Sequence, residues 1–161
     1  MYSNVSEQQL KQKITALLTS QCLSLSVAEI LTEKILDAER DGTYSHGLMR
    51  LPDYIASLNA GWVNPSAEPI ISATESAIVS VDGDNGFTQA ISEQVLPLVC
   101  ERVLRHGIAL LSIRNAHHIG ALWTDNQKYS QQGWIVLNFV NSRPRLAIYG
   151  AQKPMTGTNA M

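Results

Sequence analysis

The sequence has little charge and no long apolar run. Only 16% of the 161 residues are charged, and 12 Lys and Arg stand against 14 Asp and Glu. This balance lacks the clustered basic surplus that binds nucleic acid or an anionic membrane surface. No run of about 18 apolar residues occurs, and the N-terminal residues contain no apolar core of signal-peptide length. We therefore expect no nucleic-acid partner, no membrane span and no secretory leader.

Cysteine is also scarce. Cys22 and Cys100 lie far apart and have no further cysteine near them. This pattern excludes a disulfide framework and a cysteine-based metal site, and it predicts a reduced, cytoplasmic protein. The sequence also has no G-x-S-x-G, P-loop or G-x-G-x-x-G motif, which excludes the most readily recognised hydrolase, nucleotidase and Rossmann folds.

Hydrophobic residues make up 45% of the chain, enough for a real core. We predict a helical segment over residues 1–61. The segments 6–9 and 26–29 each carry a serine followed three residues later by Gln or Glu, which is the capping box that begins a helix. A third helical apolar stripe covers 48–58 and stops at Gly61.

Residues 62–161 have a different pattern, which predicts a partial α/β domain. Two short strands are expected on either side of residues 74–76, followed by a long helix over 87–106. The segments 108–113 and 134–140 are almost entirely apolar, as strands buried on both faces are, and a helical segment lies between them. This order predicts a βαβ unit and an α/β fold.

The first candidate site is DGTYSHGLMR, residues 41–50. If a helix begins near His46, then His46 and Arg50 lie four residues apart on one helix face. Arginine binds a carboxylate through two parallel hydrogen bonds, while histidine exchanges a proton near neutral pH. Ser45 is placed to orient the imidazole. In the alternative interpretation, Ser45 caps the helix, His46 is a surface residue and Arg50 is a solvated charge.

The second candidate site is RNAHHIGALW, residues 114–123, between a predicted strand and a predicted helix. Ligands of α/β sheets bind at the C-terminal ends of strands, where a helix N-terminus offers free N–H groups. Asn115, His117, His118 and Gly120 are therefore candidates for cofactor or substrate binding. Alternatively, one histidine caps a turn and the other packs. Adjacent histidines do not readily bind one ion, and we predict no metal.

A third stretch, GAQKPMTGTNAM, offers backbone amides and hydroxyls near the end of the chain. Together with VDGDNGFTQ, these motifs resemble, in order and separation, those of the malate/L-lactate dehydrogenase family of NAD(P)H-dependent oxidoreductases. DGTYSHGLMRLPDY is similar to the family's Asp-x-x-x-Ser-His-Gly-x-x-Arg-x-x-x-Tyr element, and PMTGTNAM to its Gly-Thr-Asn-Pro element. Ureidoglycolate dehydrogenase, diketogulonate reductase and Δ1-piperideine-2-carboxylate/Δ1-pyrroline-2-carboxylate reductase belong to this non-Rossmann group.

The resemblance implies N-terminal helices followed by a layered mixed-sheet domain of the sulfolactate dehydrogenase type. It implies reduction of a small 2-oxo or cyclic 2-imino acid with NADPH or NADH, in a homodimer. His46 would be the proton donor with Ser45 as its relay partner, Arg50 would bind the substrate carboxylate, and Tyr54 and Thr158 would contact the substrate.

The resemblance also implies a nicotinamide site that follows the second strand. In some family members the histidine that corresponds to His118 is the acid or base, so the division of roles between His46 and His118 stays open. The residues expected to line the cofactor are His118, Ile119, Gly120, Ala121 and Leu122.

The sequence departs from the family pattern in three places. Ala116 replaces a serine, Ile119 replaces an aromatic residue, and Asn159 is not followed by Pro and a further long segment. We therefore expect a truncated chain that alone binds cofactor poorly and turns over slowly or not at all. The alternative is an inactive remnant that acts only through oligomerisation. A hydrolase based on Ser45 is disfavoured because adjacent residues do not readily form the nucleophile-to-base hydrogen bond.

Overall fold

The computed structural model describes residues 5–157 and residue 161. The chain divides into two compact units, Met1–Thr124 and Asp125–Met161. The predicted division after residue 61 stays a prediction. Thr158, expected to contact the substrate, lies outside the described residues.

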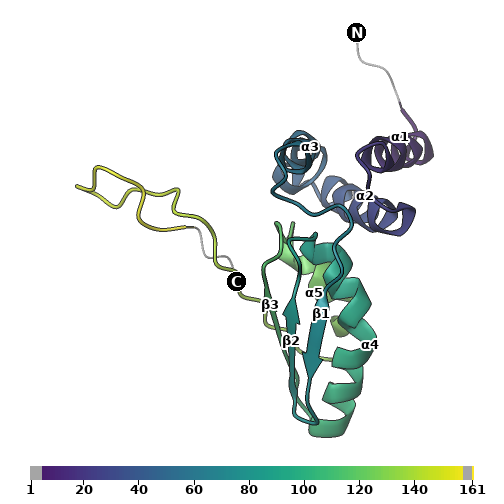
Figure 1. The fold of residues 1–161 in the computed structure, drawn as a ribbon, viewed down its shortest axis with the longest axis vertical. Coiled ribbons are helices and arrows are strands. Elements are labelled where there is room, and N and C mark those ends of the chain that lie inside the picture. Colours follow the sequence, from purple (N-terminus) through teal and green to yellow (C-terminus); the bar gives the residue numbers. More distant parts are fainter. Residues whose placement is uncertain (1–4, 158–160) are drawn as a thin grey trace. The chain divides into compact units, whose positions relative to one another are not determined.

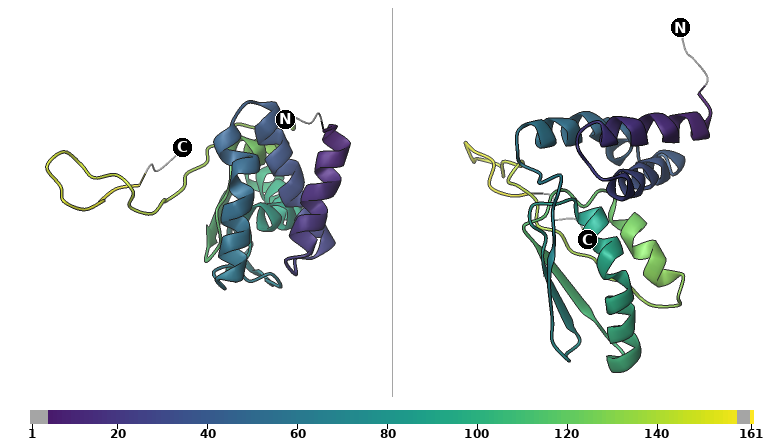
Figure 2. Two further views of the ribbon diagram at one scale, coloured as in Figure 1. Left: turned by 90° about the horizontal axis from the view of Figure 1, so that it is seen from above. Right: turned by 45° about the vertical axis from the view of Figure 1, so that its right-hand side comes forward.

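Three helices form one layer of the first unit: α1 (Glu7–Thr19), α2 (Leu25–Arg40) and α3 (Leu51–Asn59). Figures 1 and 2 show these helices together at one end of the unit, with α2 in contact with both α1 and α4. Their apolar faces pack together and form the main core, to which Phe87 from the α/β part also contributes. The buried members of this core are Ile14, Leu18, Leu23, Ala28, Leu31, Ile35, Leu36, Tyr54, Val63 and Phe87.

Serine residues cap the N-termini of α1 and α2, and the sequence predicted one of the two caps correctly. Ser6 caps α1 through the predicted capping box, in which its Oγ accepts from Gln9 N at 3.2 Å and its N–H donates to Gln9 Oε1 at 3.1 Å. The predicted capping box at 26–29 is wrong. Ser24 caps α2 instead, because its Oγ accepts from Val27 N at 3.3 Å. The helix begins at Leu25, so Ser26 already lies in its first turn.

The second layer is a mixed three-stranded sheet with α4 on one face. β1 (Ile70–Ala73) pairs antiparallel with β2 (Ile78–Asp82), and β2 pairs parallel with β3 (Leu110–Arg114). α4 (Thr88–His106) connects β2 to β3 and packs on the sheet, as Figure 1 shows. This arrangement confirms the α/β class and the two short strands around 74–76.

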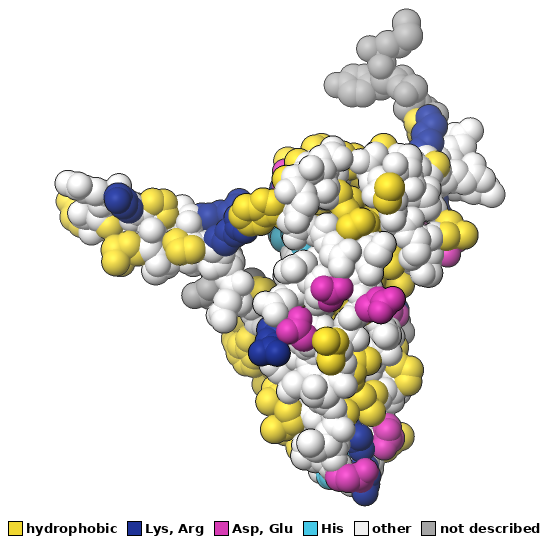
Figure 3. Space-filling model, in the orientation of Figure 1, with side chains coloured by type: hydrophobic (Ala, Val, Ile, Leu, Met, Phe, Trp, Pro, Cys, Tyr) yellow, Lys and Arg dark blue, Asp and Glu magenta, His cyan; other side chains and the backbone are white. Residues whose placement is uncertain are grey.

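The sheet is covered on one face only. Val79 and Val81 of β2 are buried, together with Ile91 and Val95 of α4. β3 is not buried on both faces, and that prediction is wrong: its first residue, Leu110, is 58% exposed, because no helix covers the second face in the described part of this unit. Figure 3 shows hydrophobic side chains over this part of the surface.

The segment 134–140 does not form the predicted strand. The helix before it is present as α5 (Leu122–Ser130), but Ile135, Leu137 and Phe139 are 95%, 73% and 68% exposed, and no ladder is formed. An apolar sequence becomes a strand only when a neighbouring strand supplies hydrogen-bond partners. The predicted βαβ unit is therefore absent from the described residues. Within this second unit, Leu146 and Thr156 form an isolated antiparallel bridge.

Across residues 5–157, we find no helix that combines the length and the hydrophobicity needed to cross a membrane.

Candidate functional site

Two loops at the carboxyl ends of the parallel strands are tied together. Asn85 N donates to Asn115 O at 2.7 Å, and His117 N donates to Gly86 O at 2.8 Å. Asn85 and Asn115 have positive φ angles of 56° and 49°, a conformation that asparagine adopts more readily than most residues. The first loop is the predicted Asp-Gly-Asp-Asn-Gly turn, and together the loops fix the start of the 117–121 segment.

The segment that carries the other histidine is not the first turn of a helix. His46 ends one 3-10 turn, η1 (Tyr44–His46), and Arg50 ends a second, η2 (Leu48–Arg50). Gly47, with φ −90° and ψ −133°, interrupts the helical path between them. The prediction that His46 and Arg50 share a helix face is therefore wrong.

Glu39 of α2 explains this break. Its Oε1 accepts from Leu48 N at 2.7 Å and so caps η2. A side chain at Gly47 would collide with the Glu39 carboxylate, so this close approach requires glycine. The contact joins residues from two elements, and the local sequence pattern gave no sign of it.

His46 is half-buried, and its Nδ1 lies 3.0 Å from the hydroxyl of Ser45. Burial lowers the pKa of His46 below its ordinary value of 6.5, and the positive charge of Arg50 lowers it further. The imidazole stacks loosely over that of His118, with ring centroids 6.1 Å apart and an angle of 22° between the planes. The two histidines from distant parts of the sequence therefore lie next to each other.

Arg50 lies beside both imidazoles. Its Nη1 binds Asp53 Oδ2 at 2.8 Å, and Asp53 itself is largely exposed. Its Nε is buried and has no hydrogen-bond partner among the described residues. A buried N–H without an acceptor carries an unfavourable desolvation cost, which an anionic ligand would remove.

Two hydrogen-bond partners lie at one ring nitrogen of His118. Gly120 N donates to its Nδ1 at 3.2 Å, and the Tyr54 hydroxyl lies 3.2 Å from the same atom. No hydrogen bond from the described residues engages its other nitrogen, Nε2.

The pKa of His118 is lowered to about 4, mainly by burial. More than a third of the residue's surface is exposed, yet its ring is crowded by the rings of Tyr54 and His46, so the imidazole is poorly hydrated. Nearby charges have a smaller effect. Those that lower the pKa belong to His117, Arg50 and His46, whereas Asp53 raises it.

Behind His118 lie two buried polar side chains. Tyr54 and Gln89 are only 2% and 1% exposed, and Gln89 Nε2 donates to the Tyr54 hydroxyl at 3.1 Å. Gln89 Oε1 has no partner in the part of the chain that is described. Gln89 also lies against Gly120, where an added Cβ would stand 2.9 Å from its Nε2. Sequence reasoning missed Gln89, because an uncharged residue inside a helical pattern gives no local signal.

His117 has a structural role. Its Nε2 lies 3.0 Å from Ser57 Oγ, and its ring packs edge-on against Phe87 and Tyr54, with centroids 5.2 and 5.8 Å away. Of the two adjacent histidines, one packs and the other faces the site. In the described ranges no group of three or more His, Cys, Asp or Glu residues is placed to hold a metal ion.

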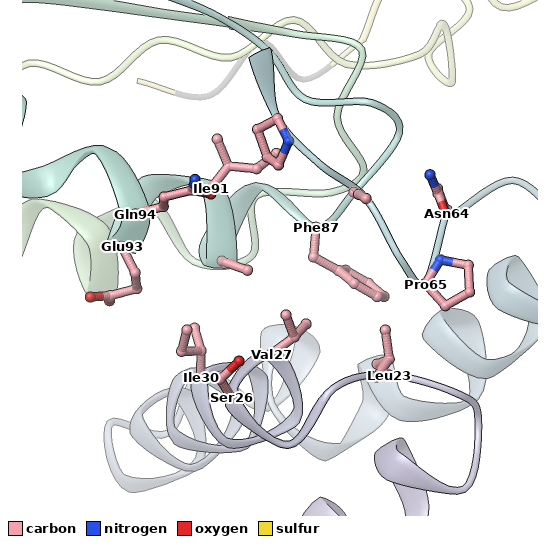
Figure 4. A pocket seen from close by; sticks show the side chains of 14 residues that line it. Leu23, Ser26, Val27, Ile30, Asn64, Pro65, Phe87, Ile91, Glu93 and Gln94 are labelled. Carbon is pink, nitrogen blue, oxygen red and sulfur yellow. The ribbon is translucent and has the colours of Figure 1, made fainter. Parts of the chain in front are cut away.

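A groove of about 390 Å³ lies between α2 and the start of α4 (Figure 4). Its lining includes Leu23, Val27, Ile30 and Phe87. None of the predicted site residues that the structure describes lines this groove. The Phe87 ring lines it and also contacts Tyr54, 5.0 Å between centroids, so the ring packs between the groove and the histidines.

The structure thus brings together five predicted residues, with Ile119, Gly120, Ala121 and Leu122 directly after the last of them. Gly120 has a φ of +81°, which strains any other residue. The five are Ser45, His46, Arg50, Tyr54 and His118.

Comparison with known proteins agrees with this geometry. Residues 5–161 match the malate/L-lactate dehydrogenase family. Δ1-Pyrroline-2-carboxylate/Δ1-piperideine-2-carboxylate reductase of Pseudomonas syringae pv. tomato is 40% identical over 136 residues, which are 84% of this chain and 40% of the relative. The reductase of the same description from Pseudomonas putida is 36% identical over 94% of this chain and 44% of its own length.

Solved structures show the same likeness. The crystal structure of Δ1-piperideine-2-carboxylate reductase from Pseudomonas syringae pv. tomato matches with a TM-score of 0.87 and 36% identity, over 98% of this chain and 48% of that one. Sulfolactate dehydrogenase from Methanocaldococcus jannaschii matches with a TM-score of 0.83 and 26% identity, over 96% of this chain and 45% of its own. The chain spans less than half the length of these relatives. It belongs to the malate/L-lactate dehydrogenase family.

Proposed function

We propose that this chain provides the carboxylate-binding and proton-donating residues of an NAD(P)H-dependent reductase of small 2-oxo or cyclic 2-imino acids. The observation that carries the proposal is the buried, unpartnered Nε of Arg50 beside two imidazoles of lowered pKa. The printed names of two relatives, which are reductases of cyclic imino carboxylates, support this substrate class.

Arg50 binds the substrate carboxylate in this proposal. One edge of its guanidinium is already held by Asp53, which limits the orientations that the side chain can adopt. An arginine fixed in this way binds a carboxylate with defined geometry at a small entropic cost. The predicted contact of Tyr54 with the substrate stays a prediction, and its buried hydroxyl is engaged by Gln89 and His118.

His46 donates the proton to the substrate oxygen or nitrogen. In the free site its pKa is lowered partly by Arg50. A bound carboxylate neutralises that charge, so substrate binding raises the pKa of His46 and favours the protonated form. Ser45 supports both forms, because a hydroxyl donates to an unprotonated Nδ1 and accepts from a protonated one.

The residues after β3 fit a nicotinamide in two respects. They follow the carboxyl end of a strand in a parallel pair, where ligands of α/β sheets bind, and no hydrogen bond from the described residues engages Nε2 of His118. Under this proposal His118, Ile119, Gly120, Ala121 and Leu122 hold the nicotinamide, which when bound supplies a hydride. The proposal includes either NADH or NADPH, and a cytoplasmic homodimer.

Cofactor titration of the 161-residue chain tests the proposal. We expect saturable binding of NADH or NADPH, and oxidation that depends on Δ1-piperideine-2-carboxylate or pyruvate. Arg50→Met should lower kcat/KM about 100-fold, since hydrogen bonds to charged groups contribute about 1.5–3 kcal/mol. Arg105→Met is the matched control, because exposed Arg105 pairs with Glu75 near the far end of α4.

A different outcome would contradict the proposal. An absence of binding to either nucleotide, together with a concentration-dependent oligomer, contradicts the proposal and supports the remnant that acts only through oligomerisation. The rate is a separate test, because robust turnover contradicts the expectation that this chain alone is slow.

A further inference from the structure

We infer that Gln89 and Tyr54 are positioning residues that hold the His118 imidazole in a single neutral tautomer, with its proton on Nε2. The use of this tautomer rests on the proposed function. The tautomer itself follows from the hydrogen bonds around the ring.

The first step concerns Gly120. Its backbone N–H donates to His118 Nδ1 at 3.2 Å. A backbone amide nitrogen has a proton to donate and no lone pair available to accept. His118 Nδ1 must therefore present a lone pair, so the proton of the neutral ring lies on Nε2.

The second step gives the direction of the Tyr54 bond. The Tyr54 oxygen lies 3.2 Å from the same Nδ1. Two lone pairs would repel at this distance, so Tyr54 must direct its single hydroxyl proton to His118. The Tyr54 oxygen can then accept a hydrogen bond from Gln89.

The third step assigns the Gln89 amide. Its Nε2 lies 3.1 Å from the Tyr54 oxygen and donates to it. If the amide were reversed, its carbonyl would compete for the Tyr54 proton and turn the hydroxyl away from His118. Because Gly120 already excludes an Nδ1 proton, the orientation with Nε2 toward Tyr54 is the consistent one. The chain of donation runs from Gln89 through Tyr54 to His118.

The charged and titratable groups around the ring agree with a neutral imidazole. Protonation at Nδ1 would break both hydrogen bonds and bring a positive charge close to Arg50. The groups that face it are Arg50 of η2, His46 of η1 and the adjacent His117, with Asp53 of α3 as the opposing carboxylate. The pKa of His118, lowered to about 4, also corresponds to a neutral imidazole near neutral pH.

This arrangement divides the roles of the two histidines. His118 presents a permanent Nε2–H donor, which hydrogen-bonds to the substrate oxygen or nitrogen without giving up its proton near neutral pH. The transferred proton then comes from His46, whose Ser45 partner tolerates both protonation states. The two imidazoles are neighbours and, in this inference, have different roles.

Nitrogen-15 NMR of the histidine rings in the ligand-free chain tests the inference. We expect His118 to carry its proton on Nε2 and to remain neutral until the pH falls to about 4. Tyr54→Phe removes one of the two donors to Nδ1 while keeping the aromatic ring, so the fraction of His118 with its proton on Nδ1 should rise, while burial keeps the pKa lowered. Gln89→Glu should act in the same direction, because its carboxylate accepts from Tyr54 and turns the hydroxyl away.

Ser57→Ala is the matched control, because this hydroxyl contacts the neighbouring His117 and not His118. It should leave the His118 signals unchanged. A wild-type ring with its proton on Nδ1, or variants that fold and leave the His118 tautomer unchanged, would overturn the inference. The measurement needs no cofactor or substrate, so a chain that shows this tautomer but no nucleotide binding contradicts the proposed function alone.

Discussion

The environments of His46 and His118 differ in what their hydrogen-bond partners can do. His46 Nδ1 faces the hydroxyl of exposed Ser45, which both donates and accepts. His118 Nδ1 faces a backbone amide that only donates, supported by two buried side chains. We therefore infer that the same residue type can change protonation at one position and is held neutral at the other.

The larger environments differ in the same way. His46 lies in a short 3-10 turn among exposed residues, whereas Tyr54 behind His118 belongs to the main apolar core. A rigid donor is best built on packed elements, since its geometry then needs no rearrangement when substrate binds. The proposed proton donor must respond to the substrate, and the Ser45 hydroxyl, which either donates or accepts, allows that response.

The largest expected effect is on the residue that changes protonation. His46→Gln should lower kcat about 10²- to 10⁴-fold, the usual contribution of a general acid. His118→Gln should lower it less, because the amide still donates a hydrogen bond. Steady-state NAD(P)H oxidation measures both. His106→Gln, at the exposed end of α4, is the control and should leave the rate unchanged. Equal losses at His46 and His118 would contradict the division of roles.

The next expected effect is a loss of stability on substitution of Gly120, whose backbone lies beside His118. Gly120→Ala should lower the free energy of unfolding by roughly 1–2 kcal/mol for its φ of +81°, plus the cost of moving Gln89. Gly42→Ala provides the comparison, because its φ is +71° and nothing lies within 4 Å of an added Cβ. Urea unfolding gives both values. Equal losses would show that Gln89 does not restrict this position.

A smaller difference is expected between the two hydroxyls. Tyr54→Phe should cost about 1–2 kcal/mol of unfolding free energy, because it leaves the buried Gln89 amide without its acceptor. Ser45→Ala should change stability by less than about 0.5 kcal/mol, as expected of an exposed residue. Thermal or urea unfolding of the two variants compares them. A larger loss for Ser45→Ala would reverse the assignment of the fixed and open environments.

A further difference is the pH dependence of stability. The pKa of His118 is about 4 in the folded chain and about 6.5 when unfolded, so the unfolded chain takes up this proton first. His118 should therefore lower stability progressively as the pH falls from about 6.5 to about 4, and no further below that. As the pH falls through this interval, the melting temperature of His118→Gln should rise relative to that of the parent chain. A constant difference would contradict the lowered pKa.

Local sequence rules predicted the features that neighbouring residues determine. The Ser6 cap needs only Gln9, and the Asp-Gly-Asp-Asn-Gly turn needs only its own residues. The start of α2 was placed wrongly because Ser24 and Ser26 satisfy nearly the same local rule. The family resemblance assigned roles to Ser45, His46 and Arg50 that local spacing left open. These residues lie close to His118 in the structure, and their roles stay predictions.

Features that depend on distant residues could not be predicted in this way. Glu39 from α2 caps η2 and separates His46 from Arg50, which spacing alone had placed on one helix. Gln89 becomes part of the site only because α4 brings it under Tyr54. The apolar segment 134–140 has strand composition but no ladder, because composition does not supply a pairing partner.

The most direct test of the account follows both imidazoles by NMR while Δ1-piperideine-2-carboxylate is added. We expect the pKa of His46 to rise, because the carboxylate neutralises the Arg50 charge that lowers it, while His118 keeps its single proton on Nε2. Arg50→Met should abolish the response. A titration in which His118 takes up the proton and His46 is unaffected would contradict the account.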